Sequence, residues 1–114
     1  MLTIKYYNKD ELSTEIYVNE EMKSIEIKNF TEHLMSRAFG INETPSWENF
    51  NEFLKSRCFP ENRQHVKLEL KRLGLNEYDP LAICKATSGR NYKDSRWMQF
   101  EYEREVDLDE NNER

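Results

Sequence analysis

The residues best able to bind a charged group are arginines and lysines in the second half of the chain. A guanidinium presents five N–H donors in a planar fork that matches carboxylates and phosphates. Trp97 follows this cluster, and Tyr92 lies inside it, where its ring could stack on a nucleobase. The pattern predicts a surface for an anionic partner, formed by the basic residues and one carboxylate: Arg57, Arg63, Arg90, Lys93, Asp94 and Arg96.

A structural role for the same arginines is the alternative. Arg57 and Arg90 stand near predicted helix ends, where a cation interacts favourably with the last carbonyl groups. Either could instead pair with Asp79 or Asp94 and hold the helices together. The sequence leaves the binding role and the structural role open.

Carboxylates gather on both sides of this basic region. Residues 1–54 carry five basic and ten acidic side chains, residues 55–96 carry ten and five, and residues 97–114 carry two and seven. Because affinity for nucleic acid grows with the number of phosphates neutralised, a chain of net charge -5 is a poor general nucleic-acid binder. A second candidate surface is therefore acidic and could imitate DNA phosphates: Glu20, Glu21, Glu101, Glu103, Glu105, Asp107 and Asp109.

No residue pattern indicates catalysis. The spacings of Ser, His and Asp match no hydrolase signature, and with only His33 and His65 a zinc site would need carboxylates from distant segments. No glycine-rich phosphate loop is present, because all three glycines stand at predicted helix ends. Cys58 and Cys84 lack CxxC spacing and are predicted to be reduced, small and buried. We expect a protein that is not an enzyme and has no cofactor or metal site.

Strand patterns occupy the first quarter of the chain. Residues 2–7, 12–18 and 22–29 are rich in β-branched and aromatic residues, and polar breaks separate them. In the third segment Ile25 and Ile27 alternate with polar residues, as in a strand with one wet face. Short connections between three such strands predict an antiparallel meander whose apolar face needs a cover.

Helical spacing of apolar residues follows, with explicit starts and stops. The predicted helices run from Asn29 to Gly40, from Ser46 to Arg57 or Cys58, from Glu61 to Leu73 and from Pro80 to Gly89. Residues 96–102 alternate as a strand again. The predicted fold class is α+β: a three-stranded antiparallel meander, four short helices on one face and a late strand that joins the sheet. We expect one domain over residues 1–102 and a flexible acidic tail over residues 103–114.

Composition favours a cytoplasmic protein. Charged residues make up 34% of the chain, and no run approaches the roughly 18 apolar residues of a membrane span. The sequence does not open with a charged start followed by an apolar stretch, so no signal peptide is predicted. The oligomeric state is not indicated.

Four segments carry a resemblance to a known family. They are RAFG (37–40), SWENFNEFLKSRCFPENR (46–63), LGLNEYDPLAICKATSGR (73–90) and DSRW (94–97). In this order they resemble a family of small proteins of Clostridia and related Firmicutes that is carried on conjugative elements and prophages. The match covers almost the whole chain. It implies a mobile-element context, which favours a role against host defence.

Two functions from different classes are therefore expected. In the first, the protein binds and inhibits a host defence nuclease, as anti-CRISPR proteins do with Cas nucleases, through acidic side chains that imitate DNA. In the second, it is a regulatory or toxin–antitoxin-type interaction module that holds a partner protein or DNA through its arginine cluster. A host protein is the expected partner in the first case, and nucleic acid is the less favoured partner overall.

Overall fold

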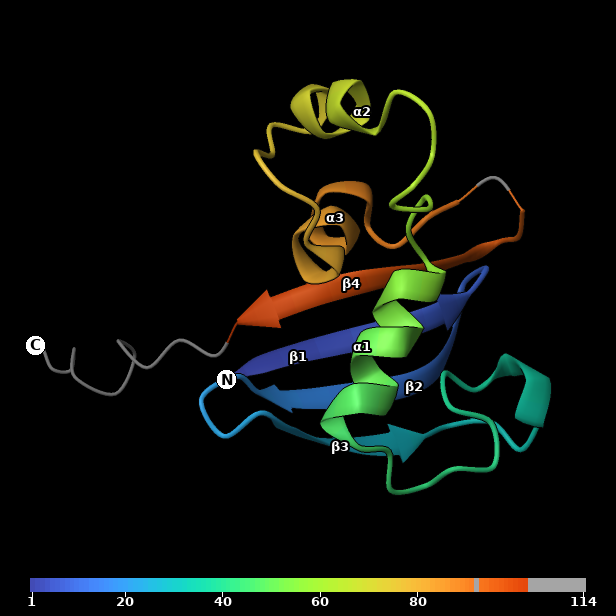
Figure 1. Cartoon of the computed structure of the whole chain (residues 1–114). Helices are drawn as coiled ribbons and strands as arrows, with labels where there is room; N and C mark the ends of the chain where they lie inside the picture. The colour runs from blue at the N-terminus through green and yellow to red at the C-terminus, as the bar shows by residue number, and fades with distance from the viewer. Residues whose placement is uncertain (92, 103–114) are drawn as a thin grey trace, which may run out of the picture.

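The computed structural model describes residues 1–91 and 93–102, which form an antiparallel sheet with helices on one face (Figure 1). The strands are β1 (Leu2–Asn8), β2 (Glu11–Asn19), β3 (Ser24–Asn29) and β4 (Arg96–Tyr102). A 3-10 turn, η1 (Leu34–Ser36), precedes the helices α1 (Trp47–Ser56), α2 (Val66–Arg72) and α3 (Pro80–Thr87). The predicted α+β class, the meander and the late strand are confirmed. The predicted tail lies outside the described residues.

The sheet has the strand order β3-β2-β1-β4, and every neighbouring pair is antiparallel. Strand β1 is central, with Ile4 opposite Ile16 of β2 on one side and Phe100 of β4 on the other. Strand β4 thus joins the sheet at the edge opposite β3. The sequence pattern did not predict which edge it would join. The chain reaches this edge because the helical segment carries it back across the sheet (Figure 1).

One face of the sheet forms the core. The inward side chains of β1 are Leu2, Ile4 and Tyr6, and their neighbours on β2 and β4 continue the same layer. Phe50 and Leu54 of α1 and Cys84 of α3 cover this layer, and each is at most 1% exposed. Helices α1 and α3 therefore cover the apolar face of the sheet that the strand pattern predicted.

The starts of these two helices are as predicted. Ser46 caps α1 in a reciprocal capping box with Asn49, which satisfies two orphan N–H groups. The Asp79 side chain accepts from the Leu81 N–H, and Pro80 occupies the first position of α3. Both signals are local in sequence, which is why they could be recognised there.

The predicted helix over 29–40 is wrong. Asn29 instead ends β3, where its side chain accepts a hydrogen bond from Thr14 Oγ1 at 2.9 Å. The Phe30 N–H donates to Ser13 O at 2.8 Å and prolongs the strand pairing. Only the single turn η1 follows, and Leu34 and Met35 remain exposed. The described chain therefore has three α-helices rather than four.

Helix α2 also departs from the prediction. It begins at Val66 rather than Glu61, because His65 adopts a left-handed conformation with φ of 66°. Its buried residue Leu70 is not part of the core on the sheet, and Figure 1 shows α2 beyond α3. The helices on the sheet face are thus α1 and α3, which corrects the prediction that all four pack there.

The segment that contains α2, residues 60–77, leaves and rejoins the fold at one place. The Tyr78 hydroxyl donates to Phe59 O at 2.5 Å, and the two rings meet edge to face with centroids 5.9 Å apart. We call residues 60–77 the α2 segment. In the described part of the chain, no helix has the length and apolar character needed to cross a membrane.

Candidate functional site

Arg57 is the centre of the predicted basic cluster and is only 7% exposed. It follows the last turn of α1 and points toward the loop between α3 and β4. Its Nε donates to Gly89 O at 3.0 Å, and its Nη2 donates to Arg96 O at 3.0 Å. Both Nη atoms also bond the Asp94 carboxylate, at 2.9 and 3.0 Å. Arg57 therefore ties α1 to the α3–β4 connection, as in the structural alternative.

The surroundings of Arg57 and Asp94 favour the guanidinium cation and the carboxylate anion. Burial works to lower the pKa of Arg57, but the hydrogen bond to Asp94 and nearby charges outweigh it and raise that pKa above its usual value. The hydrogen bond from Arg57 holds the pKa of Asp94 below its usual value. Asp94 also accepts from the Arg96 N–H at 3.0 Å. The Asp94 carboxylate therefore bonds to groups of the fold itself.

Arg96 also takes part in the fold. Its Nη2 donates to Met35 O at 2.8 Å, which links the start of β4 to the irregular segment after β3. Three of the six residues of the cluster, Arg57, Asp94 and Arg96, thus make contacts that hold chain segments together.

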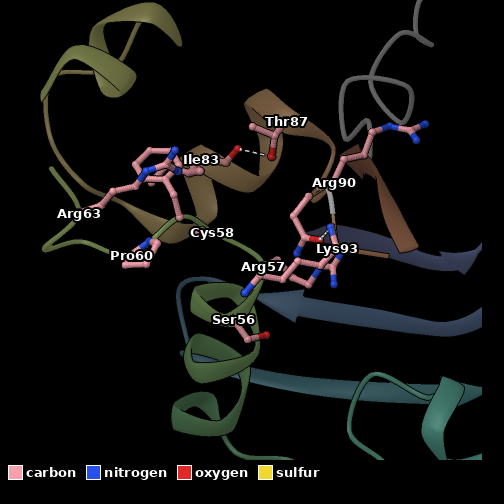
Figure 2. A pocket seen from close by; sticks show the side chains of 11 residues that line it. Ser56, Arg57, Cys58, Pro60, Arg63, Ile83, Thr87, Arg90 and Lys93 are labelled. Atoms are coloured by element: carbon pink, nitrogen blue, oxygen red, sulfur yellow. Dashed lines mark hydrogen bonds between the residues drawn. The ribbon is translucent and has the colours of Figure 1, made fainter. Parts of the chain in front are cut away.

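The other three residues, together with Arg57, line a cavity of about 500 Å³. Figure 2 shows Arg63 at one end of this cavity and Arg90 and Lys93 at the other, with Cys58, Ile83 and Thr87 between them. We call this cavity the basic pocket. Among the described residues, none of those that line it is acidic. With Arg57 neutralised by Asp94, the pocket carries the positive charge of Arg63, Arg90 and Lys93.

The arginines of the basic pocket are positioned by aromatic rings. The Arg63 guanidinium carbon lies 6.0 Å from the centroid of Phe59, and that of Arg90 lies 5.0 Å from the centroid of Trp97. Trp97 in turn stacks on Tyr7 with ring centroids 4.4 Å apart and an angle of 9° between the planes. Stacking holds a guanidinium by its face and leaves the N–H groups at its edge able to bond an anion. Within residues 1–91 and 93–102, no ion pair engages Arg63, Arg90 or Lys93.

The local sequence explains the pocket. Pro60 turns the chain after α1, so that the α2 segment forms one wall with Phe59 and Arg63. Helix α3 ends with Ser88 and Gly89 in left-handed conformations, and these redirect the chain so that Arg90 and Lys93 form the opposite wall. A built Cβ on Gly89 would lie 2.6 Å from Met98 Cε, so a side chain would also crowd the core there.

The acidic candidates are spread more widely. Glu20 and Glu21 are exposed in the turn between β2 and β3, and Glu101 is on β4, where its carboxylate lies 3.4 Å from Lys5 Nζ. The strand register places these three at one end of the sheet, since Leu2 pairs with both Val18 and Tyr102. The other four candidates, Glu103, Glu105, Asp107 and Asp109, lie outside the described residues, as does Tyr92 of the basic cluster.

Sequence reasoning missed the apolar and thiol lining of the basic pocket. Cys58, Phe59 and Ile83 line it together with Thr87 and Asn91. Phe59 between Cys58 and Pro60 was a usable signal, because a ring just before a helix-ending proline stays close to the last helical turn. Ile83 and Thr87 come from α3 and Asn91 follows it, and nothing in the sequence places α3 next to the end of α1. Among the described residues, no group of three or more His, Cys, Asp or Glu side chains could hold a metal ion.

Comparison of the chain with protein-family models, with curated proteins and with solved structures finds no match in any of the three.

Proposed function

We propose that the protein is a non-enzymatic interaction module, of regulatory or toxin–antitoxin type, whose basic pocket receives an acidic group of a partner protein. The observation that carries the proposal is the charge of the pocket. Three cationic side chains surround a cavity of about 500 Å³, and none of its described lining residues is acidic. Such a site gains charge-assisted hydrogen bonds when an anion enters it.

A protein partner is favoured over nucleic acid by the charge of the whole chain. A cavity with three cations neutralises few phosphates, while the net charge of -5 repels a polyanion. A carboxylate side chain of a protein needs only the local contact. The resemblance to a mobile-element family supports a host protein in the cytoplasm as this partner.

The experiment is a pull-down from a Firmicutes host lysate with the purified tagged protein as bait. The test variant is Arg63→Ala/Arg90→Ala/Lys93→Ala. The matched control is Lys67→Ala/Lys71→Ala/Arg72→Ala, which removes the same charge from exposed positions of α2 outside the pocket. We expect the wild type and the control to capture the same protein and the pocket variant to bind it at least about tenfold more weakly.

Two results would redirect the proposal. Equal capture by the pocket variant would refute a role for the pocket. Tight binding of naked single- or double-stranded DNA at low ionic strength, lost in the pocket variant, would make nucleic acid the partner instead. Circular dichroism of each variant separates loss of binding from loss of folding.

A second candidate is inhibition of a host defence nuclease of the Cas type by an acidic surface. The observation in its favour is that Glu20, Glu21 and Glu101 lie at the same end of the sheet, where β4 ends at Tyr102. The assay is DNA cleavage by such a nuclease with an excess of the protein. Replacement of all seven acidic candidates, Glu20, Glu21, Glu101, Glu103, Glu105, Asp107 and Asp109, by their amides should abolish inhibition, and an equally potent amide variant would exclude DNA mimicry.

A further inference from the structure

The two cysteines, which are 26 positions apart in sequence, meet where the chain just after α1 lies against α3. Their Sγ atoms are 3.9 Å apart. Both thiols also lie within hydrogen-bonding distance of the same carbonyl, Leu54 O, at 3.2 Å from Cys58 and 3.5 Å from Cys84. A shared acceptor keeps the two side chains turned toward each other.

The two thiols differ in access. Cys58 is partly exposed and lines the basic pocket, whereas Cys84 is 0% exposed and belongs to the core on the sheet. A small reagent that enters the pocket therefore meets Cys58, whereas Cys84 is covered by the fold. Figure 2 shows Cys58 between Arg63 and the residues of α3.

The surroundings also shift the pKa values of the two thiols in opposite directions. A hydrogen bond from the Cys84 thiol lowers the pKa of Cys58, against the opposing effects of burial and of Asp79. The same hydrogen bond raises the pKa of Cys84, and burial raises it further. The thiolate, which is the nucleophilic form of cysteine, is thus favoured at the accessible sulfur.

We propose that Cys58 and Cys84 form an oxidisable pair, in which Cys58 reacts with hydrogen peroxide that enters the basic pocket and Cys84 then closes a disulfide with it. This inference does not depend on the proposed binding function. In the first step the Cys58 thiolate attacks one peroxide oxygen, the O–O bond breaks and hydroxide leaves. The product is a sulfenic acid on Cys58.

In the second step Cys84 resolves the sulfenic acid. Its thiol loses its proton, its sulfur attacks the Cys58 sulfur and the S–O bond breaks. The departing hydroxide takes up a proton and leaves as water. In total, two thiols and one hydrogen peroxide give one disulfide and two waters, a two-electron oxidation of the protein.

Closure requires the two sulfurs to move closer than their present 3.9 Å. A disulfide holds its sulfurs about 2.05 Å apart, so the pair must approach by about 2 Å. The bond would join the end of α1 to the middle of α3 and enclose the whole α2 segment. Because Phe59 and Arg63 of the pocket lie within that enclosed stretch, oxidation would restrain one wall of the basic pocket.

The test uses the purified full chain treated with a small excess of hydrogen peroxide. We expect a mass loss of about 2 Da, a proteolytic peptide pair joined through Cys58 and Cys84, and full reversal by a phosphine reductant. Cys84→Ala should stop at the sulfenic acid, which dimedone traps on Cys58. Cys58→Ala should consume peroxide through its remaining thiol at least about tenfold more slowly than the wild type.

Three results would overturn the proposal. These are peroxide-treated wild type with both thiols still free to alkylate, disulfides formed only between separate chains, and a Cys58→Ala variant that reacts as fast as the wild type. Circular dichroism shows whether each variant is folded. Cys84→Ser serves in place of Cys84→Ala if the alanine variant is unfolded.

Discussion

Replacement of Arg57 by alanine should destabilise the fold by about 3 kcal/mol. The change removes the donors for Gly89 O and Arg96 O, and each carbonyl left without a partner costs about 1 kcal/mol or more. It also removes the bidentate bond to Asp94, whose side chain is 35% exposed, so we assign this pair only about 1 kcal/mol. For a chain of 114 residues the sum corresponds to a fall in Tm of roughly 10 to 15 °C.

The assay is urea and thermal unfolding at neutral pH, followed by tryptophan fluorescence and circular dichroism. Arg57→Lys should lose about 2 kcal/mol, because one ammonium cannot serve three separated acceptors. Asp94→Asn should lose about half as much as Arg57→Ala, since the guanidinium keeps both carbonyl acceptors.

Two outcomes would refute this reasoning. If Arg57→Ala unfolds within about 0.5 kcal/mol of the wild type, Arg57 does not hold α1 to the α3–β4 connection. If Asp94→Asn is as damaging as Arg57→Ala, the ion pair, rather than the two carbonyl contacts, carries the stability.

Three further predictions concern the pH dependence of the Arg57–Asp94 pair, the glycine at the end of α3 and a tyrosine on β2. The pKa of Asp94 is lowered in the folded state, so its stabilising effect is present above the ordinary pKa of 3.8 and is lost as the pH falls below it; acid unfolding should therefore be less steep in Asp94→Asn than in the wild type. Gly89→Ala should cost about 2 kcal/mol, because it combines a left-handed backbone with crowding of Met98, whereas Gly40→Ala, with φ of 59° and nothing within 4 Å, should cost only about 1 kcal/mol; equal losses in urea unfolding would contradict the crowding. The hydrogen bond to Glu15 raises the pKa of Tyr17 to about 12, and spectrophotometric titration should show it fall toward 10.0 in Glu15→Gln, with Tyr17→Phe identifying the transition.

The sequence predicted those elements whose signals are local. Ser46, and Asp79 with Pro80, were the predicted helix starts, and in the structure both cap their helices through contacts within three residues. The segment after Asn29 shows the limit of this approach. Its apolar spacing is helical, but Thr14 and Ser13 of another strand bond Asn29 and Phe30 and keep the chain extended. A partner so distant in sequence leaves no mark on the local pattern.

The candidate site divides in the same way. The basic cluster was visible in the sequence, but its division into structural and pocket-lining residues depends on tertiary contacts. Arg57 and Asp94 are 37 positions apart, and only the fold brings them together. The cysteines were both predicted to be buried, but Cys58 is only partly buried. Its approach to Cys84 depends on the packing of α3 near the end of α1, which the sequence does not reveal.

The closed base of the α2 segment has a consequence for how this protein can vary. Since Tyr78 and Phe59 already fix the two ends, the entropy cost of a longer insertion between them rises only with the logarithm of its length. Leu70 and its neighbours contribute nothing to the core on the sheet. We therefore expect residues 60–77 to tolerate a change of length better than the sheet, α1 or α3 would. If the proposed binding function holds, the wall that carries Arg63 is where the specificity of the pocket could change while the sheet, α1 and α3 stay the same.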